Sequence, residues 1–168
     1  MAGYGGAPFG LREVKLYNAD GSGALALPAV LMMHVTPTIL AETFKANGVV
    51  IGASSFITGA EWELEAGGIS LEAIAKLTGL TATQVGSTPN RTLTLTGNAE
   101  TQFPYLRIYG RSVADAGDIH CRMYRCKVTA LEGTFRQKEF WVTYVKGVAV
   151  DNGSGVLEFV QHETAAAL

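Results

Sequence analysis

At 168 residues and 48% hydrophobic content, the chain is long enough to bury a sizeable core as one domain. Charged residues make up 17%, against about 25% in typical soluble domains, and a net charge of −2 leaves no basic footprint for binding nucleic acid. We expect no membrane association, because no apolar run approaches the roughly 20 residues of a membrane helix. The start of the chain lacks the basic and apolar regions of a signal peptide, so we expect a cytoplasmic protein. A surface so poor in charge indicates a subunit partly covered by copies of itself.

The first elements alternate between glycine-rich segments and short β patterns. Residues 1–10 predict a flexible N-terminal arm, and residues 11–168 a single domain. Residues 11–17 alternate as a strand, a turn cluster follows at 18–23, and a second β segment ends at Pro37.

Asn47-Gly48 is the clearest hairpin signal, because this dipeptide favours a type I′ turn. The flanking residues predict a long hairpin at about 38–57, with arms of roughly 30 Å each. An isolated ribbon of that length is marginal in water, so either the sheet or a neighbouring subunit must bury its apolar side chains. The candidate inter-subunit residues are Phe44, Lys45, Asn47, Gly48, Val49 and Val50.

The segment 58–79 predicts a strand, a glycine turn and one helix. In the strand, apolar residues at 60, 62, 64 and 66 alternate with Glu61, Glu63 and Glu65. Ser70 is a natural N-cap and Gly79 a natural helix end, which predicts a helix at about 70–78. We expect its apolar face to hold Leu71, Ile74, Ala75 and Thr78.

The rest of the chain predicts a polar connection at 80–91 and strands at 92–96, 105–113, 119–131, 134–150 and 156–161. Turns are expected at 115–118, at Glu132-Gly133 and at 151–155. Successive hairpins of this kind predict a mainly β fold: an antiparallel β-sandwich or barrel with one flanking helix.

We find no pattern that indicates catalysis, a cofactor or a metal. The three histidines are scattered, and the spacing of Cys121 and Cys126 places them on opposite strand faces unless a bulge intervenes, so no disulfide is expected. Neighbouring carboxylates on one strand lie side by side rather than across a cleft, unlike a glycosidase pair. The acidic row is therefore either a solvated face or a surface with a specific electrostatic role.

The chain resembles the tail tube (major tail) proteins of long-tailed, siphovirus-like bacteriophages over about residues 10–166. The similar segments, in order, are GLREVKL, GAEWELEAGGISLEAIAKLTG, the STPN loop, FPYLRIYGR, GDIHCRMYRCKV, FWVTYVKGVAV and the ETA tail.

This resemblance implies a structural virion protein without enzymatic activity. Members of the family form stacked hexameric rings, and the rings form a hollow tube that conducts genomic DNA at ejection without binding it specifically. The implied partners are other copies of the chain, the tape measure protein, the tail terminator and the distal tail or baseplate proteins. The implied location is the virion tail, assembled in the host cytoplasm, with Glu61, Glu63 and Glu65 as candidate lumen-facing residues.

Two rival interpretations remain. A type VI secretion-like tube protein has the same architecture, and rings that form tubes only weakly would favour it. A small β-barrel enzyme or ligand-binding domain would need a pocket with convergent polar groups, for which the sequence offers no cluster.

Overall fold

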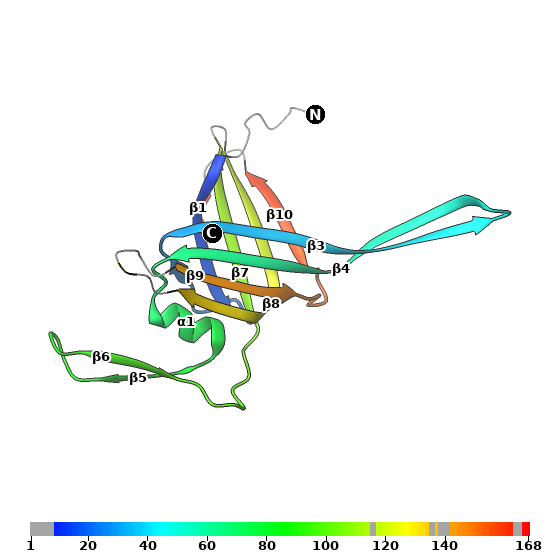
Figure 1. The fold of residues 1–168 in the computed structure, drawn as a ribbon. Helices are drawn as coiled ribbons and strands as arrows, with labels where there is room; N and C mark the ends of the chain where they lie inside the picture. The colour runs from blue at the N-terminus through cyan, green and yellow to red at the C-terminus, as the bar shows by residue number, and fades with distance from the viewer. Residues whose placement is uncertain (1–8, 115–116, 135–136, 138–141, 163–165) are drawn as a thin grey trace.

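The computed structural model describes residues 9–114, 117–134, 137, 142–162 and 166–168. Within these residues the chain is almost all β-strand, with one short helix (Figure 1). The elements are β1 (Phe9–Asn18), β2 (Leu25–Leu27), β3 (Val30–Ala46), β4 (Val49–Gly67), α1 (Leu71–Thr78), β5 (Thr81–Val85), β6 (Thr92–Thr96), β7 (Leu106–Ala114), β8 (Gly117–Thr134), β9 (Val142–Ala149) and β10 (Leu157–His162). Every strand pair is antiparallel, so the predicted mainly β fold with one flanking helix is confirmed.

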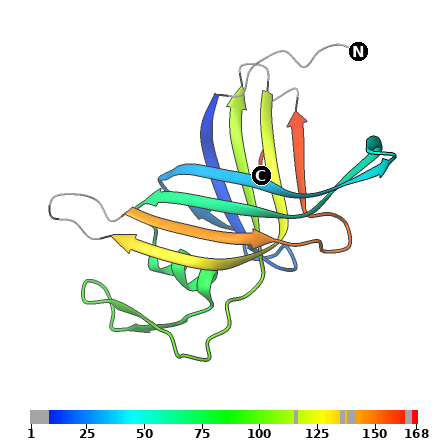
Figure 2. The same cartoon turned by 45° about the vertical axis from the view of Figure 1, so that its right-hand side comes forward.

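The long strand β8 joins two layers of one folded sheet. The strand order is β2-β1-β7-β8-β9-β4-β3, with β10 also paired to β8. The first part of β8 pairs with β7 and β10, and the part after Cys126 pairs with β9. We call β2, β1, β7, β10 and the start of β8 the first layer, and the end of β8, β9, β4 and β3 the second layer. The strands of the two layers cross at a steep angle (Figure 2).

Alternation along each strand fills the space between the layers. Trp62 and Leu64 of β4 are buried on the inner face of the second layer, opposite residues such as Leu16 of β1 and Ile108 of β7. Gly147 of β9 lies beside Trp62, where an added Cβ would stand 2.3 Å from the indole Cζ2. The predicted apolar face of the 60–66 strand is therefore the centre of the core.

The helix begins and ends where its capping residues predict. The hydroxyl of Ser70 accepts a hydrogen bond from the backbone N–H of Ala73 at 3.2 Å. At the other end Gly79 has a left-handed backbone (φ 70°), and its N–H donates to the Ala75 carbonyl at 2.7 Å.

The buried face of α1 is rotated from the predicted one. The buried residues are Ala73, Ile74, Leu77 and Thr78. Ile74 and Thr78 were predicted, but Leu71 is exposed and Ala75 only half-buried. The reason is that Ala73 and Leu77, one turn apart, pack against the sheets and turn Leu71 toward solvent.

The structure corrects three strand boundaries. β3 continues through Pro37, because β3 is an edge strand of the sheet, where a missing N–H costs no ladder hydrogen bond. Glu132 and Gly133 are not a turn, because they pair with Tyr144 and Thr143 of β9 and belong to β8, which continues to Thr134. The predicted connection 80–91 contains β5, which pairs with β6 in a separate two-stranded hairpin.

The predicted arm of residues 1–10 lies outside the described residues as far as residue 8, while Phe9 and Gly10 begin β1. The predicted turn at 115–118 also lies partly outside them, and Gly117 is already the first residue of β8.

Candidate assembly surfaces

The most prominent surface is the far end of the β3–β4 ribbon. Figure 1 shows these two strands continuing well beyond the sandwich, and Figure 2 shows the same projection after a 45° turn. We call residues 38–57 the distal hairpin. Asn47 (φ 52°) and Gly48 (φ 79°) both have a left-handed backbone at its tip, as the predicted type I′ turn requires.

The sandwich does not bury the distal hairpin. Apart from Ala46, every residue of the hairpin is exposed, and the exposed fraction is 67% for Phe44 and 63% for Val49. The large exposed apolar side chains are Ile39, Leu40, Phe44, Val49, Val50, Ile51, Phe56 and Ile57. Within this range only Glu42 and Lys45 carry a charge.

The strand register separates the hairpin into two faces that differ near the tip. Phe44 pairs with Gly52 and Ala46 with Val49, so these four residues share one face. Lys45 pairs with Val50 on the other face, after a register shift beside Phe44. From Phe44 to the tip, the first face is therefore apolar, with Glu42 on the same face one pair further from the turn, and the other face carries the ammonium group of Lys45. We call the first of these the Phe44 face.

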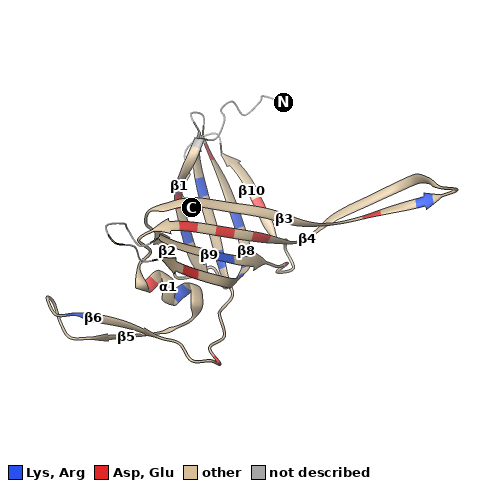
Figure 3. Ribbon diagram, in the orientation of Figure 1, with Lys and Arg blue, Asp and Glu red and all other residues tan. Residues whose placement is uncertain are grey.

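The three candidate lumen glutamates lie in a row on the outer face of the second layer (Figure 3). Glu63 forms an ion pair with Lys146 of β9 at 3.0 Å, and Glu65 accepts a hydrogen bond from the Tyr144 hydroxyl at 2.9 Å. The hydrogen bond and charge of Glu63 raise the pKa of Lys146. The row is thus held in place and partly neutralised by the neighbouring strand.

The rest of this outer face leaves a modest negative charge. By register, Glu132 and Lys127 of β8 also belong to the face, through their pairing with Tyr144 and Val148. Four carboxylates, two lysines and Arg125, which lies with Lys127 over the ring of Tyr105, leave a sum of −1.

The outer face of the first layer holds a buried ionic network that the sequence did not reveal. Asp118, which is 1% exposed, accepts hydrogen bonds from the Ala166 backbone N–H at 2.9 Å and from Arg111 at 3.4 Å. Arg111 also pairs with Glu13 at 3.1 Å and donates to the Ala166 carbonyl. These contacts hold the described C-terminal residues against β7 and β8.

A histidine pair lies next to this network. His120 is fully buried, its ring centroid is 4.5 Å from that of His162, and neither of its nitrogens has a hydrogen-bond partner in the described part of the chain. Burial is the main cause that lowers the pKa of His120, and the neighbouring His162 adds to it. Asp118 acts against this shift, with its carboxylate 3.9 Å from the His120 ring.

The only sequence signal for this cluster was the alternation of Asp118, His120 and Arg122 along a predicted strand. That pattern normally indicates a solvated face. Here Ala166 bonds to Asp118 on this face, and the pairing of β10 with β8 brings His162 next to His120. Two of the three histidines therefore lie together, unlike the predicted scatter.

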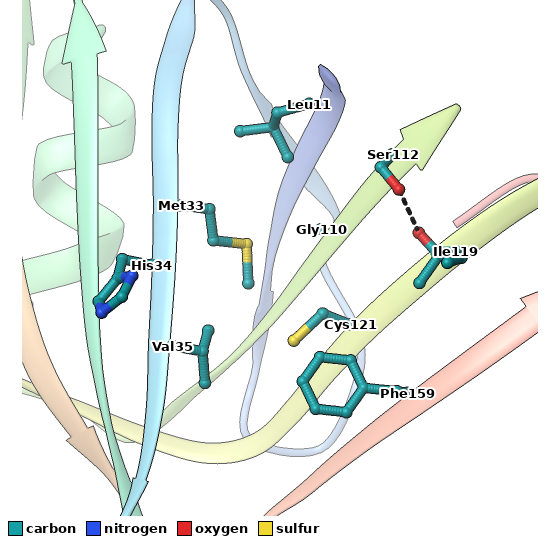
Figure 4. Close-up of a pocket in the computed structure, with 9 residues that line it drawn as sticks. All are labelled: Leu11, Met33, His34, Val35, Gly110, Ser112, Ile119, Cys121 and Phe159. Carbon is teal, nitrogen blue, oxygen red and sulfur yellow. Dashed lines mark hydrogen bonds between the residues drawn. The ribbon is translucent and has the colours of Figure 1, made fainter. Parts of the chain in front are cut away.

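An apolar hollow of about 350 Å³ opens between β3 and the first layer (Figure 4). Met33 and Val35 point into it from β3, and Cys121 and Phe159 reach it from β8 and β10. The other lining residues are Leu11, His34, Gly110, Ser112 and Ile119. His34 projects from the opposite side of β3, and the Ser112 hydroxyl donates to the Ile119 carbonyl at 3.5 Å.

Both cysteines are free, as predicted, but they do not face opposite ways. A register shift between β7 and β8 turns Cys126 inward like Cys121, so the bulge that the prediction allowed for is present. Burial raises the pKa of Cys121 to about 11 and raises that of Cys126 further, which makes both poor nucleophiles at neutral pH.

No family model and no curated protein matches this chain.

The described residues include no group of His, Cys, Asp or Glu side chains arranged to hold a metal ion. Among the same residues, none of the helical segments has the length and hydrophobicity needed to span a bilayer. The described residues instead provide three surfaces suited to contact with another protein chain: an exposed apolar hairpin, an apolar hollow and free strand edges.

Proposed function

We propose that this protein is the structural subunit of a phage tail tube, which assembles into stacked hexameric rings around a channel for genomic DNA. The observation that carries the proposal is the distal hairpin, a projecting apolar element that one subunit leaves in water. Exposed apolar patches of this kind mark protein–protein contacts.

The free energy that burial of the distal hairpin would contribute is large, of the same order as the net stability of a folded domain. Moving one large apolar side chain from water into an interface contributes about 1.5–3 kcal/mol. The eight exposed ones on the hairpin could together contribute on the order of 10 kcal/mol, before the cost of ordering is subtracted. Burial between subunits would recover this energy and would explain why the sequence keeps such a long ribbon.

The free strand edges support ring closure. β3 has no partner on its outer side, and β8 beyond Cys126 pairs only with β9 within the described residues. Exposed edges template further strand pairing. In a ring, the β3 edge of one subunit would pair with the β8 edge of the next and join the second layers into one barrel.

The outer face of the second layer would then line the channel. Its row of glutamates and its sum of −1 would repel phosphate groups, which suits DNA that slides through without specific binding. A basic lining would instead hold DNA through the release of counterions.

The ligand-binding alternative finds little support in the apolar hollow. Ligand sites combine apolar walls with a few convergent polar groups. In this hollow the serine hydroxyl is used within the protein and the histidine ring projects away.

The test is the assembly state of the purified protein. We expect rings or tubes by size-exclusion chromatography and negative-stain electron microscopy at micromolar concentration. Stable monomers with no rings or tubes would contradict the proposal, whereas rings that stack only weakly would favour a secretion-system tube protein.

A further inference from the structure

The apolar hollow lies at an open corner of the sandwich. It is bounded by β3, an edge strand of the second layer, and by β10, which among the described residues pairs only with β8. Phe159 of β10 is 61% exposed at this site. On the floor, Gly110 leaves room for Met33, because an added Cβ would stand 2.4 Å from the Met33 sulfur.

Within one subunit, the apolar hollow stays open and the apolar side chains of the distal hairpin stay exposed. The hairpin projects away from the sandwich in both views (Figures 1 and 2), and none of its residues lines the hollow of its own chain. An apolar projection and an apolar hollow at different places on one chain can instead meet between copies. Such a contact is heterologous and propagates from subunit to subunit.

Charge decides which face of the hairpin fits. The hollow is lined by no Asp, Glu, Lys or Arg side chain among the described residues. The Phe44 face is free of charge from Phe44 to the tip, and its nearest charge, Glu42, lies one pair further from the turn, whereas the other face would bring Lys45 at the tip into an apolar site. Phe44 would also meet the Met33 thioether and the Phe159 ring, which are favourable neighbours for an aromatic side chain.

We propose that the hollow is the docking site for the distal hairpin of a second copy of this chain, entered by the Phe44 face. This inference rests on the proposed tube function and specifies one of its contacts. The interface pairs Phe44, Ala46 and Val49 of one subunit with Met33, Cys121 and Phe159 of the next.

The chain offers a matched pair of variants for a cross-linking test. Val49 and Val50 are neighbours of the same type, both exposed, but on opposite faces of the hairpin. Cys121 is a native thiol in the hollow, and Cys126 is fully buried. We would assemble Val49→Cys and Val50→Cys tubes, oxidise them with diamide at pH 8.5 and identify disulfide-linked peptides by mass spectrometry.

We expect Val49→Cys to form inter-subunit disulfides with Cys121 at least fivefold more than Val50→Cys does. Adding Cys121→Ser should abolish the cross-link. If Val49→Cys tubes form normally but link to Cys121 no more than Val50→Cys tubes do, the docking site is wrong while the tube function stands. If neither variant nor the wild type forms tubes, the proposed function fails and the docking site fails with it.

Thiol protection in the wild-type protein provides a second measurement that needs no variant. We expect assembly to slow alkylation of Cys121 by N-ethylmaleimide at least tenfold relative to dissociated subunits. Unchanged alkylation in intact tubes would overturn the inference. Protection without the Val49→Cys cross-link would mean that another segment fills the hollow, which also overturns it.

Discussion

At the residue scale, Gly147 and Trp62 pack closely in the core. A Cβ added to Gly147 would stand 2.2 Å from the Lys127 carbonyl oxygen and 2.3 Å from the Trp62 ring. Backbone on one side and a fully buried indole on the other leave little room for adjustment.

We therefore expect Gly147→Ala to destabilise the fold by about 1–3 kcal/mol, the usual cost of overpacking a core. Gly52→Ala is the matched control, because a Cβ at Gly52 meets nothing within 4 Å. Urea unfolding followed by tryptophan fluorescence measures both. Equal midpoints for the two variants would show that the second layer shifts to accept the methyl group.

The buried histidine predicts how stability depends on pH. The pKa of His120 is lowered in the folded state relative to about 6.5 when unfolded. The neutral ring therefore stabilises the fold above pH 6.5, and this contribution is lost as the pH falls below 6.5, because the unfolded chain takes up the proton first. The free energy of unfolding should fall toward pH 5.5, by at most about 1.4 kcal/mol per pH unit from this residue.

His120→Phe should flatten that dependence. Both nitrogens of His120 lack partners among the described residues, so an apolar ring of similar shape removes no hydrogen bond. His34→Gln is the control, since His34 is exposed and bonds only to the neighbouring Thr36 hydroxyl among the contacts described. If His120→Phe shows the same decrease between pH 7.5 and 5.5 as the wild type, the protonation responsible lies elsewhere.

At the element scale, the distal hairpin and the sandwich are energetically separate. The hairpin contributes no residue to the buried core cluster, so its tip can be removed without opening a cavity. We expect deletion of residues 45–50 to leave a folded subunit with a melting temperature within a few degrees of the wild type.

The same deletion should abolish tube growth in negative-stain micrographs, because the tip carries the Phe44 face. A shortened variant that still forms tubes would show that the hairpin is dispensable for assembly. An insoluble, unfolded product would show instead that the hairpin supports the fold of the subunit.

At the scale of the whole molecule, the acidic face acquires a role only in an assembled ring. Replacing Glu61, Glu63 and Glu65 by lysine changes the sum on that face from −1 to +5, because each substitution adds two positive charges. We expect tubes to form, since the changed side chains face away from the core, but DNA delivery to slow severalfold.

A phage carrying the triple variant would be followed by DNA release kinetics, with Glu100→Lys in the exposed connection between β6 and β7 as a charge control outside the row. Normal tubes with unchanged release would show that the acidic row does not line the channel. Failure of the triple variant to assemble while its subunits stay folded would place the row in a subunit interface instead of the channel wall.

The sequence by itself determined the local elements whose signals are short-range. Asn47-Gly48 predicted the hairpin turn, and Ser70 and Gly79 predicted the two ends of the helix. The alternation around Trp62 predicted which face of β4 lies in the core. Each depends on backbone preferences or a period of two within a few residues.

Only the tertiary structure decided which exposed or polar residues are covered and which strands continue past a break. Pro37 stays within a strand because β3 is at an edge. The buried Asp118 bonds to the distant Ala166, and the buried His120 packs against His162 of β10. The hollow likewise exists only because β3 crosses the first layer, which brings Met33 opposite Cys121 and Phe159. These are long-range pairings, and alternation along one strand carries no information about which partner will lie across from it.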